Sequence, residues 1–177
     1  MYRAGIVASL ITLLLLASIA CSALRIHPTQ GNLVSKGPDF QITLFGNENH
    51  EDGSQLRLSE LSGKPIVLNF WYPSCPPCRI EIPDLESAAR RYATDGVLFI
   101  GIQSLVLDTA ADGQEFVEEF GITYAVGADV GGKILTEYKI IGFPTTVFLN
   151  GKHEIVHMWS GILTTEKLDE LMTDVLN

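Results

Sequence analysis

Two cysteines three residues apart, Cys75 and Cys78, are the side chains of this sequence best suited to chemistry. They follow the apolar run 66–71, whose length and β-branched and aromatic content predict a buried strand. Pro76 favours the first turn of a helix, where the N–H groups have no intrahelical partner. Those N–H groups and the helix dipole stabilise a thiolate at Cys75. Because Cys78 lies one helical turn further on, the two thiols can close reversibly into a disulfide, and such a dithiol transfers electrons.

The sequence contains three cysteines, and only this pair lies outside the N-terminal segment that ends at Leu24. A disulfide that closes so short a loop adds little stability, because the entropic gain grows with loop length. A redox role for Cys75 and Cys78 is therefore favoured over a purely structural one.

Residues 4–24 form an uncharged segment of 21 residues between Arg3 and Arg25. This length is enough to span a bilayer with a cytoplasmic N-terminus, and the same features are typical of a signal peptide. Residues 18–21 also resemble a bacterial lipobox ending at Cys21, with Ser18 in place of the usual leucine. We predict that residues 1–24 are a signal peptide or membrane anchor. The rest of the chain would then lie on the extracytoplasmic face of a bacterial membrane, tethered by the anchor or by lipidation at Cys21, or be released.

The remaining residues have the composition of one acidic domain. The 177-residue chain carries a net charge of −9, which argues against nucleic acid and anionic membrane surfaces as partners of its soluble part. Residues 25–37 are polar and contain one proline and two glycines, so they predict a linker. Residues 38–177 have the length of a single domain.

Apolar periodicity and turn residues predict alternating strands and helices in this domain. The predicted strands cover residues 40–44 and 55–58, which form a hairpin, and 66–71, 97–102, 145–149 and 154–159. The predicted helices cover residues 75–92, 112–120 with a capping box at Asp112 to Glu115, 134–138 and 164–176. This order is typical of an α/β sheet with helices on both faces. Cys75 would lie at the carboxyl end of its strand, where open α/β sheets place their sites.

Several motifs together resemble the thioredoxin superfamily, specifically its membrane-tethered TlpA/ResA-like thiol–disulfide oxidoreductases. They are Asn69-Phe70-Trp71, Cys75-Pro76-Pro77-Cys78-Arg79, Glu81, Pro83 and Gly142-Phe143-Pro144-Thr145-Thr146. The resemblance runs from about Pro38 to the C-terminus. It implies a thioredoxin-like α/β fold, with a central mixed sheet flanked by helices, an N-terminal hairpin and an insertion before the cis-proline strand.

The resemblance also implies roles for the matching residues. Cys75 resembles the exposed nucleophile that forms a mixed disulfide, and Cys78 resembles the resolving cysteine. Pro144 resembles the cis-proline beside the dithiol, where it and Phe143 would contact the substrate chain. Glu81, one helical turn beyond Cys78, would be a buried acid–base group. Asn69 replaces the buried aspartate of thioredoxin, which leaves Glu81 to handle the proton of Cys78.

The same resemblance implies the partners. They are disulfides or thiols of exported proteins, such as apocytochrome c, with a membrane thiol protein as electron donor and no cofactor.

Ser74 departs from the family, which commonly has tryptophan there, so the rim around Cys75 should be more open and polar. The four histidines are scattered, so we expect them at the surface and assign no metal. Their positions are His27, His50, His153 and His157.

The surroundings of Cys75 favour a reducing pair over a strongly oxidising one. Pro76 and Pro77 remove two N–H groups that would solvate a thiolate, and Arg79 is the only close cation and can point to solvent.

Two alternative functions are a peroxiredoxin-like thiol peroxidase and a copper-binding assembly protein. The first requires a Pro-x-x-x-Thr-x-x-Cys pattern that the residues before Cys75 lack, and the second a wider Cys-x-x-x-Cys spacing with a placed histidine.

Overall fold

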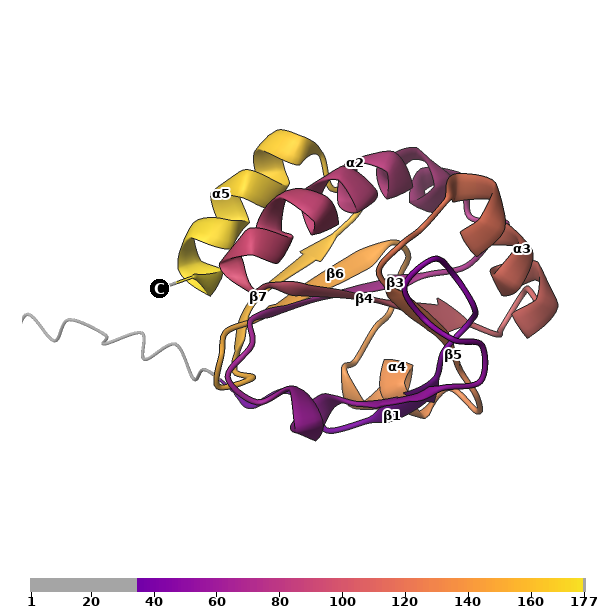
Figure 1. The fold of residues 1–177 in the computed structure, drawn as a ribbon, viewed down its shortest axis with the longest axis horizontal. Coiled ribbons are helices and arrows are strands. Elements are labelled where there is room, and N and C mark those ends of the chain that lie inside the picture. The colour runs from indigo at the N-terminus through magenta and orange to yellow at the C-terminus, as the bar shows by residue number, and fades with distance from the viewer. Residues whose placement is uncertain (1–34, 177) are drawn as a thin grey trace, which may run out of the picture. The chain divides into compact units, whose positions relative to one another are not determined.

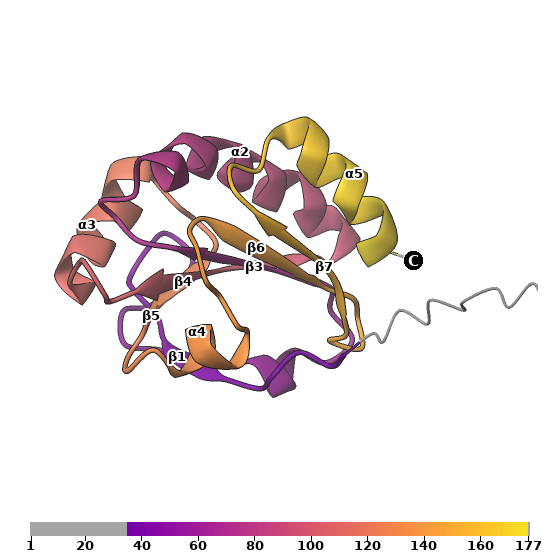
Figure 2. The ribbon, with the colours of Figure 1, turned by 180° about the vertical axis from the view of Figure 1, so that it is seen from behind.

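A computed structural model describes residues 35–176, whose core is a five-stranded mixed sheet with helices on both faces (Figures 1 and 2). The strand order is β5-β4-β3-β6-β7. The strands are β3 (Ile66–Trp71), β4 (Leu98–Ser104), β5 (Ala125–Asp129), β6 (Thr145–Leu149) and β7 (Ile155–Ser160). β3, β4 and β5 are parallel, whereas β6 is antiparallel to β3 and to β7. The predicted thioredoxin-like α/β fold is thus confirmed.

Two helical layers enclose this sheet. The helices are α2 (Pro76–Tyr92), α3 (Ala110–Phe120), α4 (Lys133–Glu137) and α5 (Thr165–Val175), with short 3-10 helices η2 (Leu58–Leu61) and η3 (Ala93–Asp95). α2, α3 and α5 lie on one side of the sheet, and α4 lies on the other with the hairpin of β1 (Gln41–Thr43) and β2 (Gln55–Arg57) (Figures 1 and 2). The segment α3-β5-α4 occupies the predicted insertion before β6.

The central strand β3 contributes side chains to both layers because successive residues of a strand face opposite sides of the sheet. Ile66, Leu68 and Phe70 belong to the core beneath the hairpin and α4. Val67 and Trp71 belong to the core beneath α2, which also contains both cysteines. All six residues of β3 are buried, so this strand fixes the position of the turn that leads to Cys75.

Two elements differ from the sequence prediction. β5 was not predicted, because its sequence of alanine, valine, glycine, alanine and aspartate has weak strand propensity; it forms by pairing with β4. The helix predicted from residue 112 begins at Ala110, and its capping box is formed by Thr109 and Asp112 rather than by Asp112 and Glu115. The Thr109 hydroxyl accepts from the Asp112 N–H, and the Asp112 carboxylate accepts from the Thr109 N–H at 2.7 Å.

Residues 35–37, which belong to the segment predicted as a linker, pair with the folded domain. Lys36 forms an antiparallel bridge with Glu154, and the Gly37 N–H donates to the His153 carbonyl at 2.8 Å. His153 itself is 5% exposed and contacts the Leu61 carbonyl through Nε2 at 3.1 Å, so the prediction of a surface histidine is wrong there. The predicted export segment, residues 1–24 with Cys21, lies outside the described residues. No helix within residues 35–176 is long and apolar enough to cross a membrane.

Candidate active site

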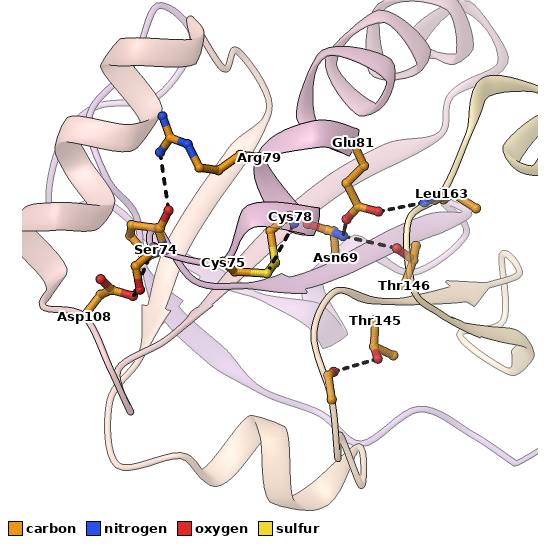
Figure 3. The surroundings of a disulfide bond; sticks show 12 residues. Asn69, Ser74, Cys75, Cys78, Arg79, Glu81, Asp108, Thr145, Thr146 and Leu163 are labelled. Atoms are coloured by element: carbon orange, nitrogen blue, oxygen red, sulfur yellow. Dashed lines mark hydrogen bonds between the residues drawn. A yellow bond between two sulfur atoms is a disulfide. The ribbon is translucent and has the colours of Figure 1, made fainter.

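Cys75 and Cys78 form a disulfide at the N-terminus of α2, at the edge of the sheet where β3 ends (Figure 3). Cys75 is the N-cap residue, and its Sγ accepts a hydrogen bond from the Cys78 N–H at 3.2 Å. Since Pro76 and Pro77 have no N–H, the Cys78 amide is the first donor of the helix. The structure therefore provides one oriented N–H group for a sulfur anion at position 75.

Neither cysteine is exposed in this oxidised state. Cys75 is 1% exposed and Cys78 is fully buried, which corrects the expectation of an exposed nucleophile. The disulfide packs within the core under α2, where the indole of Trp71 stacks on Phe116 with ring centroids 4.3 Å apart. The oxidised Cys75 therefore presents very little surface to a substrate thiol.

Glu81 lies one turn after Cys78 and is completely buried. Its Oε1 accepts a hydrogen bond from Asn69 Nδ2 at 2.7 Å, and its Oε2 accepts one from the Leu163 N–H at 2.8 Å (Figure 3). Asn69 is held in turn by its second bond, from Nδ2 to Thr146 Oγ1 at 3.1 Å, across the β3–β6 pair. Two strands, β3 and β6, and the loop before α5 thus position the Glu81 carboxyl group.

This environment changes the proton affinity of Glu81. Burial raises the pKa of Glu81 to about 7, although the hydrogen bonds from Leu163 and Asn69 partly oppose that increase. The carboxyl group can therefore take up and release a proton near neutral pH. A group of this kind is suited to proton exchange with a thiol.

Phe143 and Pro144 lie at the start of β6, at the same edge of the sheet as Cys75. The Phe143–Pro144 peptide bond is cis, as the resemblance implied. Pro144 is buried, and the half-buried ring of Phe143 packs edge-on against Tyr72 with centroids 5.2 Å apart. Tyr72 leads into the Cys75 turn, so this contact joins the proline loop to the dithiol.

Two charged contacts on the rim of the site were not predicted. Asp108 Oδ2 accepts from the Ser74 hydroxyl at 2.8 Å and from the Ser74 N–H at 3.2 Å (Figure 3). Arg79, which the sequence left free to point to solvent, pairs with Glu119 and lies 4.9 Å from the ring centroid of Phe120. The open, polar rim expected at Ser74 is thus occupied by a carboxylate from a loop 34 residues further along the chain.

Other contributors to the site could not be recognised from the sequence. Leu163 acts through its backbone N–H, which no side-chain pattern reveals. Asp108 has no motif around it and reaches Ser74 only because β4 lies beside β3. Within residues 35–176, no three His, Cys, Asp or Glu side chains come together as metal ligands.

This fold and its buried dithiol define a thioredoxin-fold thiol–disulfide oxidoreductase. The chain belongs to the AhpC/TSA family, which it matches over residues 34–158, and within it to the TlpA/ResA-like proteins. It is 33% identical to the thiol-disulfide oxidoreductase ResA of Oceanobacillus iheyensis over 138 residues, covering 78% of this chain and 70% of that protein. It is 28% identical to ResA of Geobacillus kaustophilus over 168 residues, covering 93% and 92% of the two chains.

Solved structures agree with this assignment. StoA from Bacillus subtilis superposes with a TM-score of 0.65 at 26% identity, covering 77% of this chain and 97% of that one. A putative thiol:disulfide interchange protein DsbE from Chlorobium tepidum gives a TM-score of 0.70 at 22% identity, covering 81% and 96% of the two chains. The second similarity concerns the fold alone.

Proposed function

We propose that this protein is exported and reduces disulfides of extracytoplasmic proteins through the Cys75–Cys78 pair. The observation that carries the proposal is the disulfide at the start of α2 with the Glu81 carboxyl group buried one turn behind it. A structural disulfide would gain nothing from a buried titratable group, whereas thiol–disulfide exchange requires proton transfer at each step.

The reaction begins with the reduced pair. The Cys75 thiolate attacks one sulfur of a substrate disulfide, the substrate S–S bond breaks, and the leaving substrate thiolate takes a proton. The Cys78 thiolate then attacks Cys75 Sγ, and the second substrate thiolate leaves and takes a proton. Two electrons pass to the substrate, and the enzyme is left with the Cys75–Cys78 disulfide.

Glu81 is the acid–base group for the buried thiol of Cys78. Cys78 must lose its proton before it can attack, and its side chain, fully buried in the oxidised structure, has no contact with bulk solvent. A carboxyl group with a pKa of about 7 exchanges protons readily with a thiol of ordinary pKa near 8.5. Asn69 and the Leu163 N–H hold the carboxyl group in place for this exchange.

The charges around Cys75 favour a reducing pair. Arg79 is paired with Glu119, and the Asp108 carboxylate binds the residue before Cys75. Both features, together with the two prolines, limit the stabilisation of a Cys75 thiolate. The strong oxidants of this class owe their high potential to an unusually stable thiolate.

Electrons would come from a membrane thiol protein, and apocytochrome c is one substrate that the resemblance implies. Phe143 and Pro144 would contact the substrate chain, with residues 1–24 tethering the protein to the membrane.

The test combines trapping with a redox titration. A Cys78→Ser variant should accumulate mixed disulfides with exported proteins, because no resolving thiolate is present, whereas a Cys75→Ser variant should trap none. Equilibration with glutathione buffers should place the wild-type midpoint nearer the thioredoxin value of about −270 mV than the value of about −120 mV for strong oxidants. A midpoint at the oxidising end, or equal trapping by both variants, would contradict the proposal. Rapid peroxide consumption or stoichiometric copper binding by the reduced protein would support the alternatives instead.

A further inference from the structure

The loop between β4 and α3, residues 105–108, lies beside the Cys75 turn and exposes two aliphatic side chains. Val106 is 79% exposed and Leu107 is 70% exposed. The next residue, Asp108, accepts both hydrogen bonds from Ser74, which immediately precedes Cys75 (Figure 3). Leu107 is therefore one residue away from a side chain that contacts the nucleophile turn.

Hydrogen bonds hold this loop at both ends. Gln103, buried at the end of β4, donates from Nε2 to the Thr109 carbonyl at 2.8 Å. The Val106 N–H donates to Oγ of the buried Ser104 at 3.4 Å, and Thr109 begins α3 in a capping box. A loop already ordered in this way loses little conformational freedom when a partner covers it.

Exposed apolar side chains gather at the same edge of the sheet. β3, β4, β5 and β7 all run in one direction, so their carboxyl ends and the start of β6 share the edge that carries Cys75. Among residues 35–176, eight large hydrophobic residues are exposed. Six of them follow these strand ends, precede β6 or lie in the first two turns of α2: Ile80, Val106, Leu107, Val130, Ile141 and Ile162. The remaining two, Met158 and Leu176, lie elsewhere on β7 and at the C-terminus of α5.

The geometry of a mixed disulfide indicates which residues of a protein substrate can reach this edge. Two cysteines joined by a disulfide have Cα atoms about 5.5 Å apart, and neighbouring residues along a chain are separated by at most about 3.6 Å. The residues one or two positions from a substrate cysteine bound to Cys75 are therefore within reach of the rim beside Ser74. The 105–108 loop, which Asp108 joins to this rim, exposes Val106 and Leu107 to such residues.

We propose that the 105–108 loop, held to Ser74 by Asp108, selects protein substrates that carry large apolar residues one or two positions from the reacting cysteine. Val106 and Leu107 are the specificity-determining residues, and Asp108 is the positioning residue. This inference rests on the proposed function and deepens it by naming the class of substrate.

The test uses two symmetrical peptide disulfides, one with leucine and one with serine on both sides of the cysteine. Stopped-flow fluorescence gives the rate constant for oxidation of the reduced full-length protein, in mild detergent, by each peptide. Each constant is divided by that of dithiothreitol with the same peptide, which removes differences in intrinsic thiol reactivity. The wild-type protein should prefer the leucine peptide about tenfold, equivalent to about 1.4 kcal/mol, roughly half the value of burying a leucine side chain.

Four variants separate the residues involved. Val106→Ser with Leu107→Ser should reduce the preference to less than about twofold, and the matched control Leu176→Ser should keep it. Asp108→Ala should weaken the preference, whereas Asp108→Asn, which retains an acceptor oxygen for Ser74, should preserve it.

The outcomes are distinct. Reaction with neither peptide by the wild-type protein overturns the proposed function and this inference with it. Equal reaction of the wild-type protein with both peptides overturns the inference alone. A tenfold preference that survives in the double variant also overturns it, because the selecting residues would then lie elsewhere.

Discussion

The Glu81 carboxyl group links the stability of the oxidised protein to pH. Burial raises the pKa of Glu81 from 4.5 to about 7, so the native state keeps this proton to a higher pH than the unfolded chain does. Between these values the native state binds more protons, and the free energy of unfolding falls as pH rises. Below pH 4.5 Glu81 is protonated in both states, so it no longer makes the free energy of unfolding depend on pH.

We expect Glu81→Gln to remove this pH dependence. The free energy of unfolding of the wild-type protein, relative to the variant, should fall by about 3 kcal/mol between pH 4.5 and pH 7. Urea unfolding of both oxidised proteins at several pH values measures the difference. Glu115→Gln, on the exposed face of α3, is the control and should follow the wild-type profile. Parallel profiles for the wild-type protein and Glu81→Gln would show that Glu81 titrates as it does in the unfolded chain.

Among single residues, those that belong to a local motif could be predicted from the sequence. Cys75, Cys78 and Glu81 lie on consecutive turns of one helix, so their spacing places them together without knowledge of the rest of the fold. The burial of the Cys75–Cys78 disulfide could not be predicted, since it depends on Trp71 and Phe116 from different elements. Trp71 is buried in this core, in agreement with the buried strand predicted over residues 66–71.

Among the elements, the β1–β2 hairpin depends on a close backbone contact with β5. Leu44 forms a bridge with Gly127, and the Phe45 N–H donates to the Val126 carbonyl at 2.8 Å. A Cβ atom at position 127 would lie 2.4 Å from the Thr43 carbonyl oxygen. Only glycine allows the hairpin to approach β5 this closely.

Gly127→Ala should therefore destabilise the protein by about 1–3 kcal/mol, because the hairpin must move away from β5. Thermal or urea unfolding of the oxidised protein measures this loss. Gly142→Ala is the matched control, since a Cβ atom there meets nothing within 4 Å and its stability should change by less than about 0.5 kcal/mol. Equal stability of the two variants would show that the hairpin is free to shift.

This contact also explains why β5 escaped prediction. A strand prediction depends on β-branched and aromatic residues, and β5 has one valine among small residues and an aspartate. Its glycine is required by the hairpin. Its other four residues are buried, because β5 packs against β4, α3 and α4. The strands rich in β-branched and aromatic residues, β3 and β6, were predicted because each satisfies local propensity and burial at once.

At the scale of the molecule, the boundary of the folded domain depends on residues just before Pro38. The Ile155 N–H donates to the Ser35 carbonyl at 2.8 Å, and the Gly37 N–H donates to the His153 carbonyl at the same distance. The sequence alone favours a linker there, because residues 25–37 show no periodic apolar face. Their pairing uses backbone groups, which any sequence supplies.

We expect the domain to fold and exchange disulfides without the N-terminal segment, and its stability to depend on where truncation falls. A chain of residues 34–177 keeps both backbone hydrogen bonds, whereas a chain of residues 38–177 loses them. At about 0.5–1.5 kcal/mol for each bond, the shorter chain should be less stable by about 1–3 kcal/mol. Urea unfolding of the two oxidised proteins measures the difference, and reduction of a peptide disulfide by each should proceed at the same rate. Equal stability would show that residues 35–37 contribute nothing to the fold, and an insoluble 34–177 chain would show that folding requires the segment before residue 34.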